Sequence, residues 1–168
     1  RIHESVICYA GNLSKAGFIK GLQDLHPVRF HLYGEGAPSD IPKENISCHA
    51  PQPPASLPGL LEGSYGLIWD GPSIHTCDPY LQYNTPHKAS LYLLAGLPLI
   101  VWAKSALADM VEKEELGFTV EKLGELPEKL ASISMEQYTL WRSRVTEKGQ
   151  LLSQGKQLLS VLQQLDQD

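Results

Sequence analysis

Short apolar runs that end in glycine, asparagine or aspartate alternate with segments of helical spacing, and this alternation restricts the fold more than any other feature of the chain. The runs are rich in β-branched and aromatic residues, as buried strands are. Strands that alternate with helices are typical of a mostly parallel, doubly wound sheet with helices on both faces. The sequence therefore predicts a Rossmann-like α/β fold with strands at residues 5–10, 28–33, 46–49, 65–69, 99–102 and 118–120.

The segments between these runs predict the helices. Apolar residues recur at helical spacing after Ser14, which is a good N-cap residue. The segment 54–61 can form only a short helix because a proline and a glycine interrupt it. The last helical segment is long, and Gly149 and Gly155 are expected to kink or divide it. The remaining helices are expected at residues 85–95, 106–114, 126–132 and 135–165.

Residues 83–101 predict a loop, a helix, a tight turn and a buried strand, and they carry the first indication of a binding site. Thr85 is expected to be the N-cap and Pro86 the first helical residue, where its missing N–H does no harm. Free backbone N–H groups and the helix dipole favour an anion at such a helix start. Lys88 lies in the first turn, where a cation opposes the dipole unless an anion binds there. Lys88 is therefore predicted to bind a phosphate, and the alternative is a solvated surface lysine.

The loop after the first strand repeats this arrangement. Ligands of doubly wound sheets bind beyond the carboxyl ends of the strands. Lys15 follows the first strand there and is a second candidate phosphate ligand, with Asn12 in the same loop. The loop matches neither a Walker A motif nor the GxGxxG fingerprint, so a surface position of Lys15 is equally open.

Three further polar residues each have two possible roles. Asn84 and His87 are predicted either to hydrogen-bond a phosphate or a ribose, or to cap the helix and pack its loop. Asp70 follows the strand at 65–69, where a carboxylate can accept hydrogen bonds from sugar hydroxyls or act as a base. The alternative for Asp70 is an Asx-type turn with Gly71.

The composition excludes several classes of function. The net charge is −5 and no basic run occurs, which argues against a nucleic-acid surface. Cysteines and histidines lack zinc spacing, so no metal is expected, and no GxSxG motif of a hydrolase is present. Three cysteines without a CxxC pair fit a reducing cytoplasm. No apolar segment is long enough for a membrane span, and the start at Arg1 suggests a piece of a longer protein.

The aromatic residues and the last helix complete the expected organisation. Tyr80 and Tyr83 lie in the long loop before residue 85 and are expected outside the core, whereas Trp69, Tyr92 and Trp102 are expected within it. Residues 1–133 are predicted to form the Rossmann-like domain that carries the phosphate site. Residues 134–168 carry more apolar positions than one small sheet needs to cover. They are expected to pack both on the domain and on another domain or subunit.

Four segments together resemble one enzyme family, and the resemblance covers nearly the whole chain. The most specific part is an NxPHKxSxYLxAGLP motif at residues 84–98. The chain is similar to the C-terminal half of bacterial glucosyltransferase 3 type enzymes of the GT-B architecture, which are also named beta-1,6-galactofuranosyltransferases. The segments that carry the resemblance are residues 10–15, 32–36, 66–71 and 83–102.

The resemblance implies binding of UDP or a UDP-sugar. No metal is demanded, because two lysines and the helix dipole can do what a metal does elsewhere. By position, Lys88 and Lys15 resemble the basic pair that neutralises the diphosphate in this family, and Asn84 and His87 match the motif. His49 stands on the loop where relatives tend to have an aromatic residue near the nucleotide. The catalytic residues remain unassigned, and this half alone is expected to be inactive.

The resemblance also implies partners. In GT-B enzymes an N-terminal domain supplies most of the acceptor site, and here it would lie outside the chain. Characterised relatives are cytoplasmic oligomers that add glucose to O-linked glycans of serine-rich repeat adhesins. The expected acceptor is therefore a glycan or glycoprotein, and the expected assembly a homo-oligomer. Two alternatives stay open, which are a UDP-sugar epimerase-like enzyme and a non-catalytic nucleotide-binding or scaffolding module.

Overall fold

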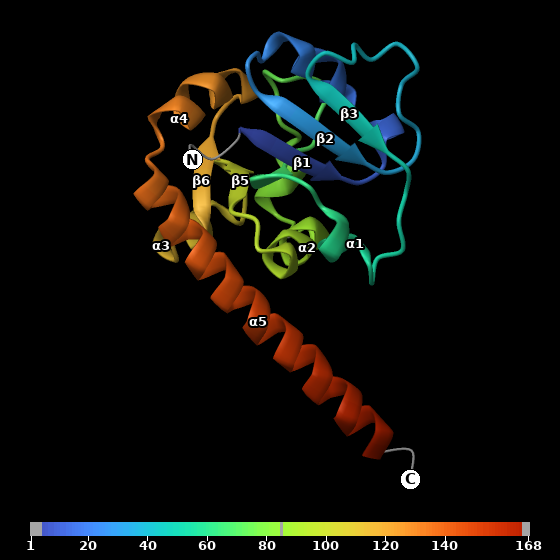
Figure 1. Ribbon diagram of the computed structural model, residues 1–168, viewed down its shortest axis with the longest axis vertical. Coiled ribbons are helices and arrows are strands. Elements are labelled where there is room, and N and C mark those ends of the chain that lie inside the picture. Colours follow the sequence, from blue (N-terminus) through green and yellow to red (C-terminus); the bar gives the residue numbers. More distant parts are fainter. Residues whose placement is uncertain (1–4, 85, 166–168) are drawn as a thin grey trace.

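The computed structural model describes residues 5–84 and 86–165, the last ten of these by their backbone alone. A six-stranded sheet in the order β3-β2-β1-β4-β5-β6 forms the centre of the molecule, and every neighbouring pair is parallel. The predicted Rossmann-like fold is thereby confirmed (Figure 1). The strands are β1 (Val6–Ala10), β2 (Arg29–Tyr33), β3 (Ile46–His49), β4 (Tyr65–Ile68), β5 (Leu99–Trp102) and β6 (Gly117–Val120).

The central strands are buried along their whole length, which explains why they read as continuous apolar runs. All residues of β1, β4 and β5 are buried, because helical layers cover both faces of the sheet. One face packs against the short helical segments after β1 and against α4. The other face packs against α2 and α3 (Figure 1). The helices are α1 (Leu57–Leu60), α2 (His87–Ala95), α3 (Ala108–Lys113), α4 (Leu126–Ser132) and α5 (Met135–Leu165).

The segment after β1 is helical in a different form from the one expected. Residues from Leu13 onward form two 3-10 segments, η1 (Leu13–Lys15) and η2 (Gly17–Asp24), in place of one helix that begins at Ser14. Phe18, Ile19 and Leu22 are buried as expected, because their spacing places them on one face of a 3-10 segment as well as of an α-helix. The prediction of an apolar helical face was right, and the prediction of its hydrogen bonding was wrong.

The start of α2 lies one residue later than expected. Pro86 is the N-cap residue, with extended backbone angles, and His87 is the first helical residue. The prediction that Pro86 is the first residue inside the helix was therefore wrong. The proposed cap, Thr85, lies outside the described residues. The helix ends at Gly96, which has the left-handed conformation that glycine tolerates best.

The last helix is continuous, so the expectation that a glycine divides it was wrong. α5 begins beside α4, packs against α2, and its second half projects away from the sheet (Figure 1). The structure explains the glycine at position 149, because a Cβ atom there would lie 2.2 Å from the Leu93 carbonyl oxygen. Within the described residues, no helix combines the length and the apolar character that crossing a membrane requires.

Candidate functional site

The strand order places a crevice beyond the carboxyl ends of β1 and β4. From β1 the chain builds the sheet outward through β2 and β3, and it then returns to add β4, β5 and β6 on the other side. β1 and β4 are therefore the two neighbours at which the winding direction changes. Loops that follow such strands diverge to opposite faces and leave an opening for a ligand. Here the loops begin at Gly11 and at Trp69, with Asp70 the second residue of the latter.

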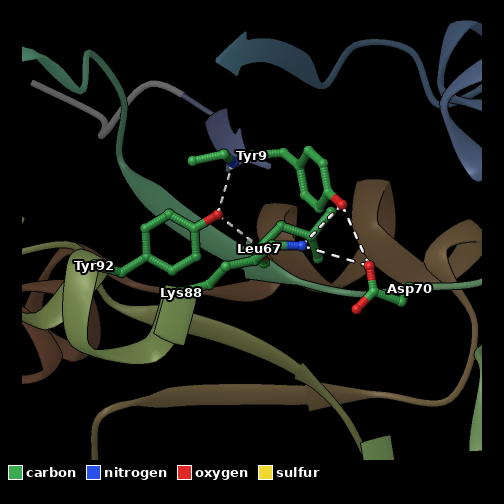
Figure 2. A network of polar contacts seen from close by, with 6 residues as sticks. Tyr9, Leu67, Asp70, Lys88 and Tyr92 are labelled. Carbon is green, nitrogen blue, oxygen red and sulfur yellow. Dashed lines mark hydrogen bonds and ion pairs between the residues drawn. The ribbon is translucent and has the colours of Figure 1, made fainter. Parts of the chain in front are cut away.

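Tyr92 fixes α2 against this opening. Its side chain is fully buried, and its hydroxyl accepts a hydrogen bond from the Ala10 N–H and donates one to the Leu67 carbonyl, each at 3.0 Å. The ring lies on Gly66, where a Cβ atom would be 2.2 Å from Tyr92 Cγ. Tyr92 thus joins β1 to β4 near their carboxyl ends (Figure 2). Because Lys88 is one turn earlier on the same face of α2, it reaches the crevice.

Lys88 extends across the end of β1 toward Asp70. A Cβ atom on Gly11 would lie 3.1 Å from Lys88 Cε, so the lysine stem passes directly over this glycine. Lys88 Nζ lies 2.8 Å from the Tyr9 hydroxyl and 3.4 Å from Asp70 Oδ1 (Figure 2). The ammonium also lies 4.1 Å from the centre of the Tyr9 ring. The structure thus brings the side chains of Tyr9, Asp70 and Lys88 together from three separate segments.

Burial and charge act on Lys88 in opposite directions. Only 19% of its side chain is exposed, and this burial lowers the pKa of the ammonium, while the Asp70 carboxylate raises it. The sequence led us to expect an anion near this first-turn lysine, and Asp70 is one such anion within the protein itself. The side chain of Asp70 faces Tyr9 and Lys88, which differs from the Asx-type turn considered as its alternative role.

A cleft of about 470 Å³ opens beside this cluster. Asp70 and Lys15 both line it, so two of the predicted residues share one cavity, and Lys88 contacts its wall through Asp70. Tyr80 also lines the cleft and is 64% exposed, while Tyr83 is 84% exposed, as expected for these two tyrosines. The complete lining consists of Lys15, Gly17, Asp70, Gly71, Pro72, Asp78, Tyr80 and Leu81.

The loop that carries Lys15 is held by its own side chains and by the turn after β2. Asn12 Oδ1 accepts hydrogen bonds from the Ser14 N–H at 3.1 Å and from the Ser14 hydroxyl at 2.6 Å. Asn12 therefore caps η1 and has less capacity left for a ligand. Gly34 packs so closely that a Cβ atom would lie 1.8 Å from the Gly11 carbonyl oxygen. These contacts fix the path of the loop next to the cleft.

The other predicted residues are not part of the lining of this cleft. Asn84 is half-buried just before α2, and His87 is exposed at the first position of that helix. His49, the last residue of β3, stacks on Tyr33 with ring centres 4.4 Å apart and planes 8° apart. Its Nε2 atom lies 3.3 Å from His31 Nδ1. The structure thus joins Lys88, Lys15 and Asp70, and it leaves His49 in a separate aromatic cluster.

Sequence reasoning missed Tyr9 and did not assign a site role to Tyr92. Tyr9 occupies an apolar run and is 1% exposed, so its sequence environment indicates only a core residue. A signal does exist for Tyr92, because it stands four residues after Lys88 on a helix. Among the described residues, no three histidine, cysteine, aspartate or glutamate side chains are grouped as a metal site would need.

Comparisons with known sequences identify relatives of the chain. The family model described as glucosyltransferase 3-like, C-terminal domain, matches residues 7–165. The beta-1,6-galactofuranosyltransferase WbbI of Escherichia coli (strain K12) is 36% identical across 96% of this chain and 49% of its own length. Glucosyltransferase 3 of Streptococcus gordonii is 32% identical across 68% of this chain and 35% of its own length. The chain thus spans half or less of the length of these relatives.

Solved structures share the fold at low sequence identity. Anabaena Alr3699/HepE, solved in complex with UDP-glucose, superimposes on 96% of this chain and 49% of its own, with a TM-score of 0.62 and 12% identity. WaaG, a glycosyltransferase of lipopolysaccharide biosynthesis, covers 89% of this chain and 44% of its own, with a TM-score of 0.58 and 15% identity. With its doubly wound sheet and its sequence relatives, the chain belongs to the glucosyltransferase 3-like C-terminal domain family.

Proposed function

We propose that this chain is the nucleotide-sugar-binding half of a UDP-sugar-dependent glycosyltransferase. The observation that carries the proposal is the Lys88 ammonium, held over Gly11 beyond the carboxyl ends of β1 and β4. Lys15 and Asp70 line the adjoining cleft. A diphosphate bound across this opening would meet two lysines and the first amides of α2.

In this proposal the site acts by stabilising a leaving group. When the bond between the sugar and UDP breaks, negative charge grows on the β-phosphate. Preorganised cations and backbone N–H groups lower the energy of that charge without having to reorient. Lys88 is suited to this role because its stem is buried and its position is fixed. Lys15 is exposed and would act from the other side of the diphosphate. The charge of the two lysines makes a divalent metal unnecessary in this scheme.

The proposed donor is a UDP-hexose, and the two sequence relatives suggest glucose or galactofuranose. The proposed acceptor is a glycan, and the resemblance to glucosyltransferase 3 favours an O-linked glycan on an adhesin. We place the rest of the acceptor cleft in a domain outside this chain, against which residues 134–168 would pack. Homo-oligomeric assembly in the cytoplasm belongs to the same proposal.

A thermal-shift panel tests the donor class. UDP, UDP-glucose and UDP-galactofuranose at 1–2 mM, concentrations of order 1,000 times a micromolar Kd, are expected to raise the Tm of the chain. ADP and GDP at the same concentration serve as controls for a phosphate-only effect. If none of the uridine nucleotides stabilises the chain, the proposal fails and a scaffolding role gains support. Equal shifts with all diphosphates would retain the phosphate site and remove the preference for uridine.

A further inference from the structure

Tyr9 lies beneath the proposed phosphate site and has a role that the mechanism above does not use. It is the fourth residue of β1 and is 1% exposed. Its ring meets Phe18 edge to face, with centroids 5.1 Å apart and planes at 84°. A phenol held in this way has little freedom to move. Its hydroxyl is therefore a fixed point within the cluster of Lys88 and Asp70.

The hydroxyl lies between two opposite charges and bonds to both. It accepts a hydrogen bond from Lys88 Nζ at 2.8 Å and donates one to Asp70 Oδ1 at 3.3 Å (Figure 2). The direct distance from Lys88 Nζ to Asp70 Oδ1 is 3.4 Å. Direct ammonium–carboxylate hydrogen bonds are usually about 2.7–2.9 Å long. The ion pair is thus stretched, with the phenol bonded to each partner.

We propose that Tyr9 is a positioning residue that keeps Lys88 from closing onto Asp70 and so leaves the ammonium available for a diphosphate. This inference rests on the proposed function of the site. Without the hydroxyl, Lys88 would gain a short hydrogen bond to Asp70, and an incoming phosphate would have to displace that carboxylate. The Tyr9 phenol therefore favours binding of Lys88 to the diphosphate over its pairing with Asp70.

Other charged groups near Lys88 do not supply this separation. Lys15 and Asp78 lie along the cleft, and Tyr92 faces Ala10 and Leu67. Burial and the neighbouring Asp70 carboxylate both raise the pKa of Tyr9, so it remains a neutral phenol over the range in which enzymes are assayed. The spacing of Lys88 from Asp70 consequently does not depend on deprotonation of Tyr9.

The test combines Tyr9→Phe with calorimetric titration of UDP. Tyr9→Phe is expected to weaken UDP binding about tenfold, the value of one charge-assisted hydrogen bond. The matched control is Tyr138→Phe, which removes another buried phenol hydroxyl, one that donates to the Ser64 carbonyl at 3.0 Å before the start of β4. This control is expected to bind UDP as the wild type does. The Tm of each variant is measured to show that it folds.

A second comparison separates positioning from general damage. In the Asp70→Asn background there is no carboxylate for Lys88 to approach, so adding Tyr9→Phe is expected to change the UDP affinity by less than twofold. If Tyr9→Phe weakens binding by the same factor in both backgrounds, Tyr9 is merely structural and the inference is wrong. It is also wrong if the single variant binds UDP as tightly as the wild type.

A ligand-free measurement keeps this inference distinct from the proposed function. Lysine ¹³Cε signals are followed by NMR as the pH rises, and the Lys88 signal is assigned by its loss in Lys88→Arg. Closer approach to Asp70 stabilises the ammonium, so Tyr9→Phe is expected to raise the Lys88 titration midpoint, whereas Tyr138→Phe leaves it unchanged. An unmoved or lowered midpoint overturns the spacing by Tyr9. If the wild type fails to bind UDP, the proposed function fails, and the midpoint still decides the role of Tyr9.

Discussion

At the scale of single residues, Lys88 combines a buried stem with a charged end, which is unfavourable in the ligand-free protein. Burial is the larger influence on its pKa and lowers it, so the folded state holds the proton less firmly than the unfolded chain does. Asp70 compensates in part, through a contact of 3.4 Å. Charged groups kept at such a cost are common where a binding site requires them.

Lys88→Met is expected to stabilise the chain and to remove UDP binding. Methionine keeps the length of the stem without the buried charge, so we expect about 1 kcal/mol of added stability, or roughly 2–4 °C in Tm. The control is Lys20→Met at an exposed position of η2, where neither Tm nor UDP affinity should change appreciably. Calorimetry with UDP and a thermal scan measure both effects. A lower Tm for Lys88→Met would identify Lys88 as a structural ion-pair partner.

The lowered pKa of His31 is expected to make the stability of the chain depend on pH. Its burial, and then the neighbouring His49 ring, lower the pKa of His31 below its usual value of 6.5. The unfolded chain therefore binds a proton that the folded chain binds less readily, and the free energy of unfolding falls as the pH drops below about 6.5. In His31→Gln this part of the acid-side loss should disappear. Urea unfolding at pH 7.5 and pH 5.5 measures it, and an equal loss in both proteins would contradict the assignment.

The residues of the cluster differ in how visible they are from sequence. Lys88 was predicted because a lysine in the first turn of a helix conflicts with the helix dipole. Asp70 was predicted because it follows a strand. The role of Tyr9 can be inferred only once it is known that β1 and β4 are neighbours and that α2 lies across their ends. A single sequence contains no such pairing information, so Tyr9 looks like a core aromatic residue.

At the scale of elements, the close packing of α5 on α2 depends on one glycine. Gly149 faces the backbone of α2, where a Cβ atom would be 2.2 Å from the Leu93 carbonyl oxygen. Gly155 lies on the same helix, and a Cβ atom there meets nothing within 4 Å. Position 149 therefore has no room for a side chain, whereas position 155 has room for one.

The same substitution at these two glycines is expected to have opposite effects. Gly149→Ala should destabilise the chain by about 1–3 kcal/mol, because the two helices must separate. Gly155→Ala should stabilise it by up to about 1 kcal/mol, because alanine favours a helix more than glycine does. Urea unfolding of the two variants checks both signs. A neutral or stabilising Gly149→Ala would show that α5 does not pack on α2 as closely as described.

Strands were easier to predict than helices, for a physical reason. A strand buried on both faces needs a continuous apolar run, and the runs at β1, β4 and β5 have few other interpretations. The helical segments depend on details of hydrogen bonding that spacing does not decide. Phe18, Ile19 and Leu22 suit a 3-10 segment as well as an α-helix. The reason for Gly149 likewise appears only once α2 lies beside α5.

At the scale of the whole molecule, the chain spans 49% of the length of its galactofuranosyltransferase relative. In the proposal, the other wall of the cleft belongs to a domain outside this chain. Binding and transfer are therefore expected to separate experimentally. The sequence could predict this division only through the family resemblance, because nothing in the local pattern of one domain describes another.

The isolated chain is expected to bind UDP-glucose without transferring glucose. Chain and radiolabelled UDP-glucose are incubated with an O-glycosylated adhesin acceptor, and product is followed over hours beside a full-length transferase of the family as a positive control. We expect turnover at the level of a blank without protein, because the proposal assigns most of the acceptor site to a domain outside this chain. Transfer by the chain alone would show that these residues contain a complete active site.

Mapping of UDP binding by NMR tests the central claim most directly, because it locates the ligand. With ¹⁵N-labelled chain, the account predicts that UDP shifts the amide signals of Gly11–Lys15, Asp70–Gly71 and His87–Ala89, around the cleft and the start of α2. The signals of the charged groove between α3 and α5, at residues 113–116 and 144–151, should stay in place. Shifts centred on that groove, or none at millimolar UDP, would contradict the account.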